Sequence, residues 1–433
     1  MKIMLVQPFA HLPGAYQVYT RCMSRILAES GVQGTLITFC GFSDDDTDIP
    51  INHYSVISSI GFWAKPLRLL LKFLNFVPPC RPLIYPLQTT LTFWLALRQG
   101  KKQEYDVVHL LNTSTVSFLF LAFAYIVKHR NLILTFHGLP REHLLKNWRK
   151  DFTKSLKAGD YYICFCILIS KLSSSGLISS VKKFLYHHAI KKNHLAFVCH
   201  AQEEREAYAQ CVFYDRVTYV PESRPKPALV SMQEARQHLK LPQDRWIFLC
   251  FGINSNNKNY EVIFQAVQDL PRNFQLLFTG KVLTENAKSN DPNQLTEEYR
   301  LVGNTTVVNR FITEGEKRYY FYAADALILS YYKGFSQQSG NLLDACQYGL
   351  PVIATGDEQI GEWVRSYNIG LTFIPEDSSS LRQAISAFMN LSDKERQGMG
   401  NHMSEFGASV RSWEQMSRGY LDLYQSLLEK NYV

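Results

Sequence analysis

Short apolar, β-prone segments alternate with helical segments along this chain, in two successive series, and this pattern leaves few folds open. The first series predicts strands at 2–7, 34–39, 106–111, 131–136 and 194–199. The second series predicts strands at 246–251, 274–279, 305–308, 326–330 and 351–354. Strands that alternate with helices predict an α/β fold with parallel sheets covered on both faces.

A composition break separates the two series. The segment 220–229 (VPESRPKPAL) holds three prolines and is typical of a linker. A chain of 433 residues is long enough for two large domains. We therefore predict domains at 1–220 and 221–411, joined by a hinge and facing across a cleft. In doubly wound sheets, ligands bind at the carboxyl ends of the strands.

Several classes of protein are excluded by composition and motif. The nine cysteines form no C-x-x-C pair, which argues against a zinc site and favours a reducing, cytoplasmic location. The first residues, MKIMLVQPFAHLPG, do not resemble a signal peptide, and we predict no transmembrane helix. G-x-G-x-x-G and P-loop patterns are absent, so dehydrogenases and ATPases lack their phosphate cradles.

Charge is unevenly distributed along the sequence. Residues 1–220 hold 25 Lys and Arg against 14 Asp and Glu, although the whole chain is only +8. The tracts 49–103 and 161–202 contain no acidic residue, and they mix basic with large apolar side chains. This mixture is typical of a helix at an anionic membrane surface, although a core-facing helix with a solvated basic face gives the same pattern. No nucleic-acid-binding motif is present, so a nucleic acid partner is not expected.

A string of motifs in the second half resembles a known family. The segments that carry the resemblance are LTFHG, NNKNYEVIFQA, LLFTGK, RFITEGEKRYYFYAADALILS, SGNLLDACQYGLPVIAT and GLTFIPEDSSSLRQAI. Their order and spacing resemble family 4 of the retaining glycosyltransferases of the GT-B type, well from about 217 onward and in patches before. The resemblance implies two Rossmann-like domains, with the acceptor bound by the first and a nucleoside-diphosphate sugar by the second. It also implies that the C-terminal helix, 412–433, crosses back to pack on the first domain.

Residues for holding a diphosphate follow two of the predicted strands. Gly340 and Asn341 open a predicted helix, with Ser339 as its N-cap, and free N–H groups at a helix start suit a phosphate. The resemblance places Lys258 against the phosphates, with a solvated loop lysine as the alternative. Relatives pair this lysine with a preceding arginine, but the loop that begins at Gly252 has none.

The resemblance extends to two carboxylates that touch the donor in relatives. These positions align with Ser336, which lacks a carboxylate, and with Asp344, which keeps one for the ribose hydroxyls. A surface helix acid is the alternative for Asp344. The resemblance further implies His137 at the reacting centre and Gly14 near the phosphates. It places Arg310 and Phe311 near the base, and topology puts Asn112 and Thr113 on the acceptor side.

These features predict a retaining glycosyltransferase that moves a sugar from a nucleoside diphosphate to a glycan or lipid-linked acceptor at the cytosolic membrane surface. No cofactor and no metal are expected, and the acidic run 44–48 (DDDTD) is interpreted as a solvated loop. The missing arginine and Ser336 leave open a non-catalytic protein that binds a nucleotide or partner. A phosphorylase or epimerase on the same scaffold is a third alternative.

Overall fold

The structure is a computed structural model. It describes residues 1–8, 10, 15–39, 54–58, 84–102, 104–111, 131–135, 194–202, 204–206, 217–254, 257–282, 290–335 and 339–429. The chain divides into two compact units, which are described separately. Unit 1 comprises Met1–Val220 and Ser417–Val433, and unit 2 comprises Pro221–Met416.

Unit 1 is built on a parallel sheet that, among the described residues, has seven strands. In spatial order they are β3 (Tyr54–Ser58), β2 (Gln33–Thr38), β1 (Lys2–Val6), β4 (Val107–Leu110), β5 (Asn131–Thr135), β6 (His194–Cys199) and β7 (Val217–Tyr219). The five strands predicted here are confirmed. The two edge strands, β3 and β7, were not predicted.

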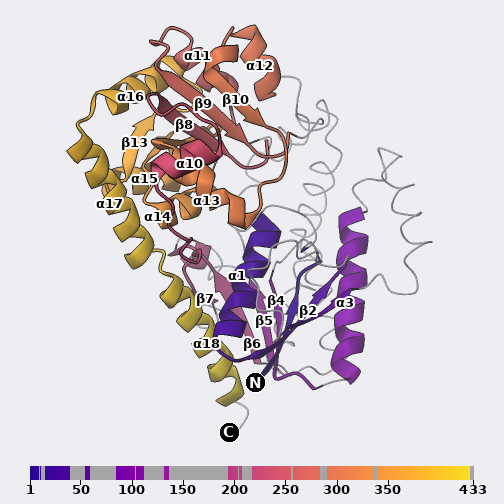
Figure 1. The fold of residues 1–433 in the computed structure, drawn as a ribbon. Helices are drawn as coiled ribbons and strands as arrows, with labels where there is room; N and C mark the ends of the chain where they lie inside the picture. Colours follow the sequence, from indigo (N-terminus) through magenta and orange to yellow (C-terminus); the bar gives the residue numbers. More distant parts are fainter. Residues whose placement is uncertain are drawn as a thin grey trace, which may run out of the picture. The chain divides into compact units, whose positions relative to one another are not determined.

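The faces of this sheet are covered by helices (Figure 1). α3 (Ile84–Lys102) packs Phe93 and Ala96 into a cluster with Met4, Val6 and Val108 of the strands. α1 (Ala15–Glu29) buries Met23, Ile26 and Leu27. The apolar side chains on α1 and α3 therefore position these helices by burial against the sheet.

The last helix, α18 (Trp413–Glu429), belongs to unit 1 from Ser417 onward. The Tyr420 hydroxyl hydrogen-bonds the Tyr19 hydroxyl of α1. Buried His109 of β4 binds the Tyr424 hydroxyl through Nδ1 at 2.8 Å and Thr135 Oγ1 through Nε2 at 2.7 Å. Buried polar groups with fixed partners specify one docking position for this helix.

Unit 2 is built on a second parallel sheet, which has six strands among its described residues. Their spatial order is β10 (Thr305–Val308), β9 (Phe274–Thr279), β8 (Trp246–Phe251), β11 (Ala326–Leu329), β12 (Val352–Thr355) and β13 (Gly370–Phe373). Five of these match the predicted segments, and β13 was not predicted. The strand order reverses direction between β8 and β11, as in dinucleotide-binding sheets.

Alternate residues of β8 enter different cores on the two faces of the sheet. Ile247, Leu249 and Phe251 join one core, whereas Phe248 and Cys250 join the other. The helices of this unit are α10 (Met232–His238), α11 (Glu261–Val267), α12 (Pro292–Glu298), α13 (Glu314–Ala323), α14 (Gly340–Tyr348), α15 (Glu358–Ser366), α16 (Ser378–Asn390) and α17 (Asp393–Ser409), with a 3₁₀ turn at Val302–Asn304. The α/β fold class with parallel sheets covered on both faces is thereby confirmed.

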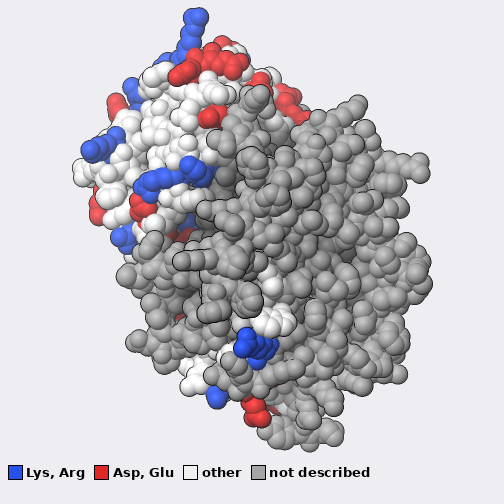
Figure 2. Space-filling model, turned by 90° about the vertical axis from the view of Figure 1, so that its right-hand side faces the viewer, with Lys and Arg blue, Asp and Glu red and all other residues white. Residues whose placement is uncertain are grey.

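The basic tracts fall largely outside the described residues, and α3 is the main described element within them. No helix among the described residues is both long and apolar enough to span a bilayer. On the face shown in Figure 2, the described surface of unit 2 carries interspersed acidic and basic side chains. Unit 2 therefore does not present a surface of one sign on that face.

Candidate donor site

The site is built where β8 and β11 end, next to the start of α14. Gly252 follows β8 directly, and Ser330 and Tyr331 follow β11. Lys258 forms a β-bridge with Tyr331, which ties the loop after β8 to the segment after β11. The strand order reverses between β8 and β11. Doubly wound folds bind ligands at the carboxyl ends of the strands on either side of such a reversal.

The first turn of α14 presents backbone donors. Ser339 is its N-cap, as predicted, and its Oγ accepts a hydrogen bond from the Leu342 N–H at 3.3 Å. The Tyr331 hydroxyl lies 2.8 Å from the same Oγ and fixes its position. Among the described residues, nothing accepts a hydrogen bond from the N–H groups of Gly340 and Asn341. These two donors are therefore available to an anion.

Lys258 brings a buried cation to this turn. The residue is only 9% exposed, which excludes a solvated loop lysine. The Nζ atom donates to the Phe251 carbonyl at 2.6 Å, and no described carboxylate pairs with it. An ammonium has three N–H donors, so two remain for a ligand. A buried cation without a protein anion is costly, and an anionic ligand removes that cost.

The electrostatics of Lys258 agree with this geometry. Burial lowers its pKa from 10.5 to about 8, and nearby Cys250 opposes the shift only in part. Lys258 is therefore still mostly protonated at neutral pH. A bound anion would stabilise its charged form and raise its pKa.

Gly252 lets the backbone pass close to this cation. It has φ +94°, a conformation that glycine adopts without strain. A Cβ placed on it would lie 3.2 Å from Lys258 Nζ and 3.4 Å from Asn341 Oδ1. Asn341 Nδ2 donates to the same Phe251 carbonyl as the lysine, at 2.7 Å. Gly252, Lys258 and Asn341 thus meet at one point, where any larger residue than glycine would intrude.

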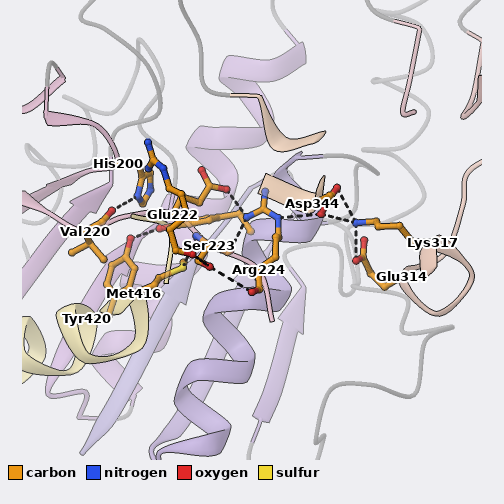
Figure 3. A network of polar contacts seen from close by, with 12 residues as sticks. His200, Val220, Glu222, Ser223, Arg224, Glu314, Lys317, Asp344, Met416 and Tyr420 are labelled. Atoms are coloured by element: carbon orange, nitrogen blue, oxygen red, sulfur yellow. Dashed lines mark hydrogen bonds and ion pairs between the residues drawn. The ribbon is translucent and has the colours of Figure 1, made fainter. Parts of the chain in front are cut away.

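Asp344 lies one turn further along α14, in a buried ionic cluster (Figure 3). Its two carboxylate oxygens accept hydrogen bonds from Lys317 Nζ at 3.1 and 3.2 Å. Arg224 Nε lies 3.7 Å from Asp344 Oδ1. Each cation has a further acid at 2.8 Å, Glu314 for Lys317 and Glu222 for Arg224. Asp344 is only 7% exposed, so the alternative of a surface helix acid is wrong.

Burial and charge compete within this cluster. Burial alone would lower the pKa of Lys317, but Asp344 and Glu314 outweigh it and the pKa is raised. Burial raises the pKa of the Asp344 carboxyl, and Lys317 and Arg224 counteract that rise. The carboxylate that the resemblance assigns to the ribose is therefore already bound by two cations of the protein.

Arg310 and Phe311 follow β10. The Arg310 guanidinium binds the Glu316 carboxylate through Nη1 at 3.0 Å and Nη2 at 2.5 Å. The hydrogen bond from Arg310 is the main reason that the pKa of Glu316 is lowered to about 2. Glu316 also completes the capping box of α13 with Thr313. Phe311 is 44% exposed, so its ring is accessible to a flat ligand such as a base.

Other predicted residues lie outside the described part of the chain. These are the proposed reacting-centre residue His137, Gly14, Ser336, and the acceptor-side pair Asn112 and Thr113. Within the described residues, no group of three or more His, Cys, Asp or Glu side chains is arranged to hold a metal ion.

Sequence reasoning missed Arg224 and Lys317. Lys317 carries a usable signal, because it lies three and four residues before the buried Tyr320 and Phe321 and so shares their helix face. A lysine on an apolar helix face indicates that a buried acid pairs with it. Arg224 stands in a proline-rich segment, where no local periodicity distinguishes it from a solvated linker residue.

Residues 231–405, roughly two fifths of the chain, match the family model described as "Glycosyl transferases group 1". Over this segment the chain is similar to that family. The segment contains β8 through α16 and most of α17, and with them Lys258, Lys317, Asp344 and the first turn of α14. Arg224 and Glu222 lie just before it. No curated protein matches the chain in sequence.

Solved structures resemble the whole chain in fold. Sucrose-phosphate synthase from Thermosynechococcus elongatus is 19% identical, covering 99% of this chain and 100% of its own, with a TM-score of 0.65. Anabaena HepE in complex with UDP and glucose is 13% identical, covering 98% and 100%, with a TM-score of 0.66. WaaG, a glycosyltransferase involved in lipopolysaccharide biosynthesis, is 13% identical, covering 96% and 98%, with a TM-score of 0.63. At these identities the likeness establishes the fold alone, two Rossmann-like domains of the GT-B type.

Proposed function

We propose that this protein is a glycosyltransferase that moves a sugar from a nucleoside diphosphate to a glycan or lipid-linked acceptor, with retention of configuration. The observation that carries the proposal is the anion site formed by Lys258 and the N–H groups of Gly340 and Asn341. Transfer of a sugar from a nucleotide develops negative charge on the departing diphosphate, and fixed donors stabilise that charge. The domain match at 231–405 and the UDP-bound structure of the HepE neighbour support this assignment.

In this proposal unit 2 binds the donor and unit 1 binds the acceptor. Lys258 and the α14 amides hold the diphosphate, Asp344 and Ser339 order the first turns of the helix, and Phe311 with Arg310 lies near the base. His137 acts at the reacting centre. The protein supplies the positive charge itself, so turnover should be unchanged by a chelator such as EDTA.

The test is an assay of the whole protein with a panel of nucleotide sugars, among them UDP-glucose, UDP-galactose and GDP-mannose. Release of the nucleoside diphosphate and transfer to an acceptor are measured together. We expect turnover of at least one donor, abolished by Lys258→Met. Absence of turnover and hydrolysis with every donor, together with absence of nucleoside diphosphate binding, would refute the proposal.

Two observations favour a second candidate, a non-catalytic protein that binds a nucleotide. Asp344 is held by Lys317 and Arg224, and the loop from Gly252 to Lys258 lacks an arginine. A site that binds UDP tightly and yields no product with any donor or acceptor would identify this function.

We also propose that the protein acts on the cytosolic membrane surface, through α3. Trp94 is 51% exposed, and the Arg98 guanidinium lies 5.4 Å from the centre of its ring. A surface tryptophan beside an arginine, in a tract without acidic residues, suits the interface of an anionic bilayer.

A further inference from the structure

We propose that Arg224 is a second phosphate-binding cation of the donor site, supplied by the segment before the glycosyl transferases group 1 domain. This inference rests on the proposed function, since it assigns a further residue to the same diphosphate. It starts from a mismatch of charge. A diphosphate carries at least two negative charges, whereas the loop from Gly252 to Lys258 contributes one cation.

The loop itself does not provide the missing charge. Between Phe251 and Lys258 the sequence is GINSNN, without any basic residue. Asn254 is buried, and its amide exchanges hydrogen bonds with Asn290, at 2.8 Å to the Asn290 carbonyl and 3.1 Å from Asn290 Nδ2. Asn254 therefore holds the loop in place through these hydrogen bonds, and its neutral amide adds no positive charge.

Arg224 also lies beside the start of this helix. A Cβ placed on Gly340 would lie 3.6 Å from Arg224 Nη2. Gly340 is the first residue of α14, and the next residue, Asn341, adjoins Gly252 and Lys258. The two cations thus approach neighbouring residues of one helical turn. A phosphate that accepts from these amides has oxygens left for a guanidinium, at the short distances of about 2.7–2.9 Å typical of charged pairs.

The protein holds Arg224 in a fixed position before any ligand binds. It is 5% exposed and stands between Pro221 and Pro225 with Glu222 and Ser223. Ser223 is fully buried, donating its hydroxyl to the Arg411 carbonyl and its N–H to Met416 Sδ at 3.3 Å. Arg224 Nη1 donates to Glu222 at 2.8 Å and to the Ser223 carbonyl at 2.9 Å. A guanidinium held in this way loses little entropy when a ligand binds.

Glu222 distinguishes phosphate binding from a purely structural ion pair. If Arg224 binds phosphate, the Glu222 carboxylate competes with the ligand, so Glu222→Gln should tighten binding. If Arg224 only ties the linker to Asp344, loss of the Glu222 charge should leave ligand binding unchanged or weaken it.

The experiment measures the affinity of the whole protein for UDP, UMP and inorganic pyrophosphate by calorimetry, with Arg224→Gln, Arg224→Lys and Glu222→Gln. We expect Arg224→Gln to lower the affinity for UDP and pyrophosphate by at least about tenfold, because it removes a charge-assisted hydrogen bond. The affinity for UMP should fall by much less. Arg224→Lys should fall between wild type and Arg224→Gln, and Glu222→Gln should bind UDP more tightly than wild type.

Several outcomes would overturn the assignment. These are equal losses for UDP and UMP, an Arg224→Gln protein that binds UDP like wild type, or a failure of wild type to bind either UDP or pyrophosphate. If Arg224→Gln does not fold, as judged by thermal melting, Arg224→Lys and Glu222→Gln decide the question. Binding that depends on Arg224 without turnover of any donor would contradict the proposed function and leave the role of Arg224 intact.

Discussion

The Lys258 ammonium and the Asn341 side-chain amide donate to one acceptor, the Phe251 carbonyl, at 2.6 and 2.7 Å. This shared acceptor sets the last residue of β8, the following loop and the first turn of α14 in one fixed arrangement. The same two side chains border the space left by Gly252.

Lys258→Met should abolish UDP binding and yet stabilise the empty protein. The variant removes a buried charge that the fold holds at a lowered pKa, and it loses one hydrogen bond to the Phe251 carbonyl. We expect a net gain of about 1 to 2 kcal/mol in the free energy of unfolding at pH 7. Urea denaturation measures stability, and Lys258→Arg, which keeps the charge, is the control. A destabilised Lys258→Met protein would contradict this account of the empty site.

Binding and stability should respond to pH in opposite directions through Lys258. UDP binding requires the protonated ammonium, so affinity should fall as the pH rises through about 8. The unfolded chain holds the lysine proton up to a pKa of 10.5, so the contribution of Lys258 to stability should rise between pH 8 and 10.5. Other groups titrate in this range, so wild type is compared with Lys258→Met for stability and with Lys258→Arg for binding. A wild-type affinity as flat with pH as that of Lys258→Arg would exclude Lys258 as the titrating group.

Asp344→Ala should destabilise unit 2 by about 3 kcal/mol, because it leaves Lys317 and Arg224 buried without their shared carboxylate. Lys317→Met should also destabilise. The double variant Lys317→Met with Asp344→Ala should lose less than the two single losses combined, by about 1 to 3 kcal/mol. Chemical denaturation of the single and double variants provides the cycle. Simple additivity would show that the two side chains do not interact in solution.

Ser339→Ala should cost about 1 kcal/mol of stability through loss of the N-cap. Ser392→Ala is the control, because the Ser392 hydroxyl likewise accepts from the N–H three residues on, at the start of α17. We expect similar losses in thermal stability from both variants, but weaker UDP binding only from Ser339→Ala, where the cap orients the Gly340 and Asn341 amides. Equal UDP affinity in both variants would show that the first turn of α14 does not bind the ligand.

The membrane proposal predicts binding of the protein to phosphatidylglycerol vesicles and weak binding to phosphatidylcholine vesicles. Trp94→Ala and Arg98→Gln should each reduce sedimentation with the anionic vesicles, because they remove exposed groups that a bilayer interface accommodates. Arg25→Gln, which alters an exposed helix residue paired with Glu29, is the control. Equal sedimentation of all variants would exclude α3 as the contact.

The sequence predicted the strands that local composition marks clearly. The segment 246–251 (WIFLCF) is uniformly apolar and ends at Gly252, so β8 was found with its observed bounds. β7 and β13 have three and four residues with partly exposed side chains, too short for a periodic signal. β3, also missed, lies in the acid-free tract that was interpreted as a helix at a membrane.

The site shows the same division between local and long-range information. Ser339 as N-cap and the opening of α14 at Gly340 were predictable, because capping depends on neighbouring residues. The pairing of Asp344 with Lys317 and Arg224 joins three segments that only the folded sheet brings together. The resemblance assigned this carboxylate to the ribose, and the structure shows the contacts that it makes with Lys317 and Arg224.

The most direct test of the central claim is a crystal structure of the whole protein with UDP. We expect the diphosphate oxygens within hydrogen-bonding distance of Lys258 Nζ and of the Gly340 and Asn341 N–H groups, in the space beside Gly252. A diphosphate bound elsewhere, with Lys258 still donating only to the Phe251 carbonyl, would contradict the account.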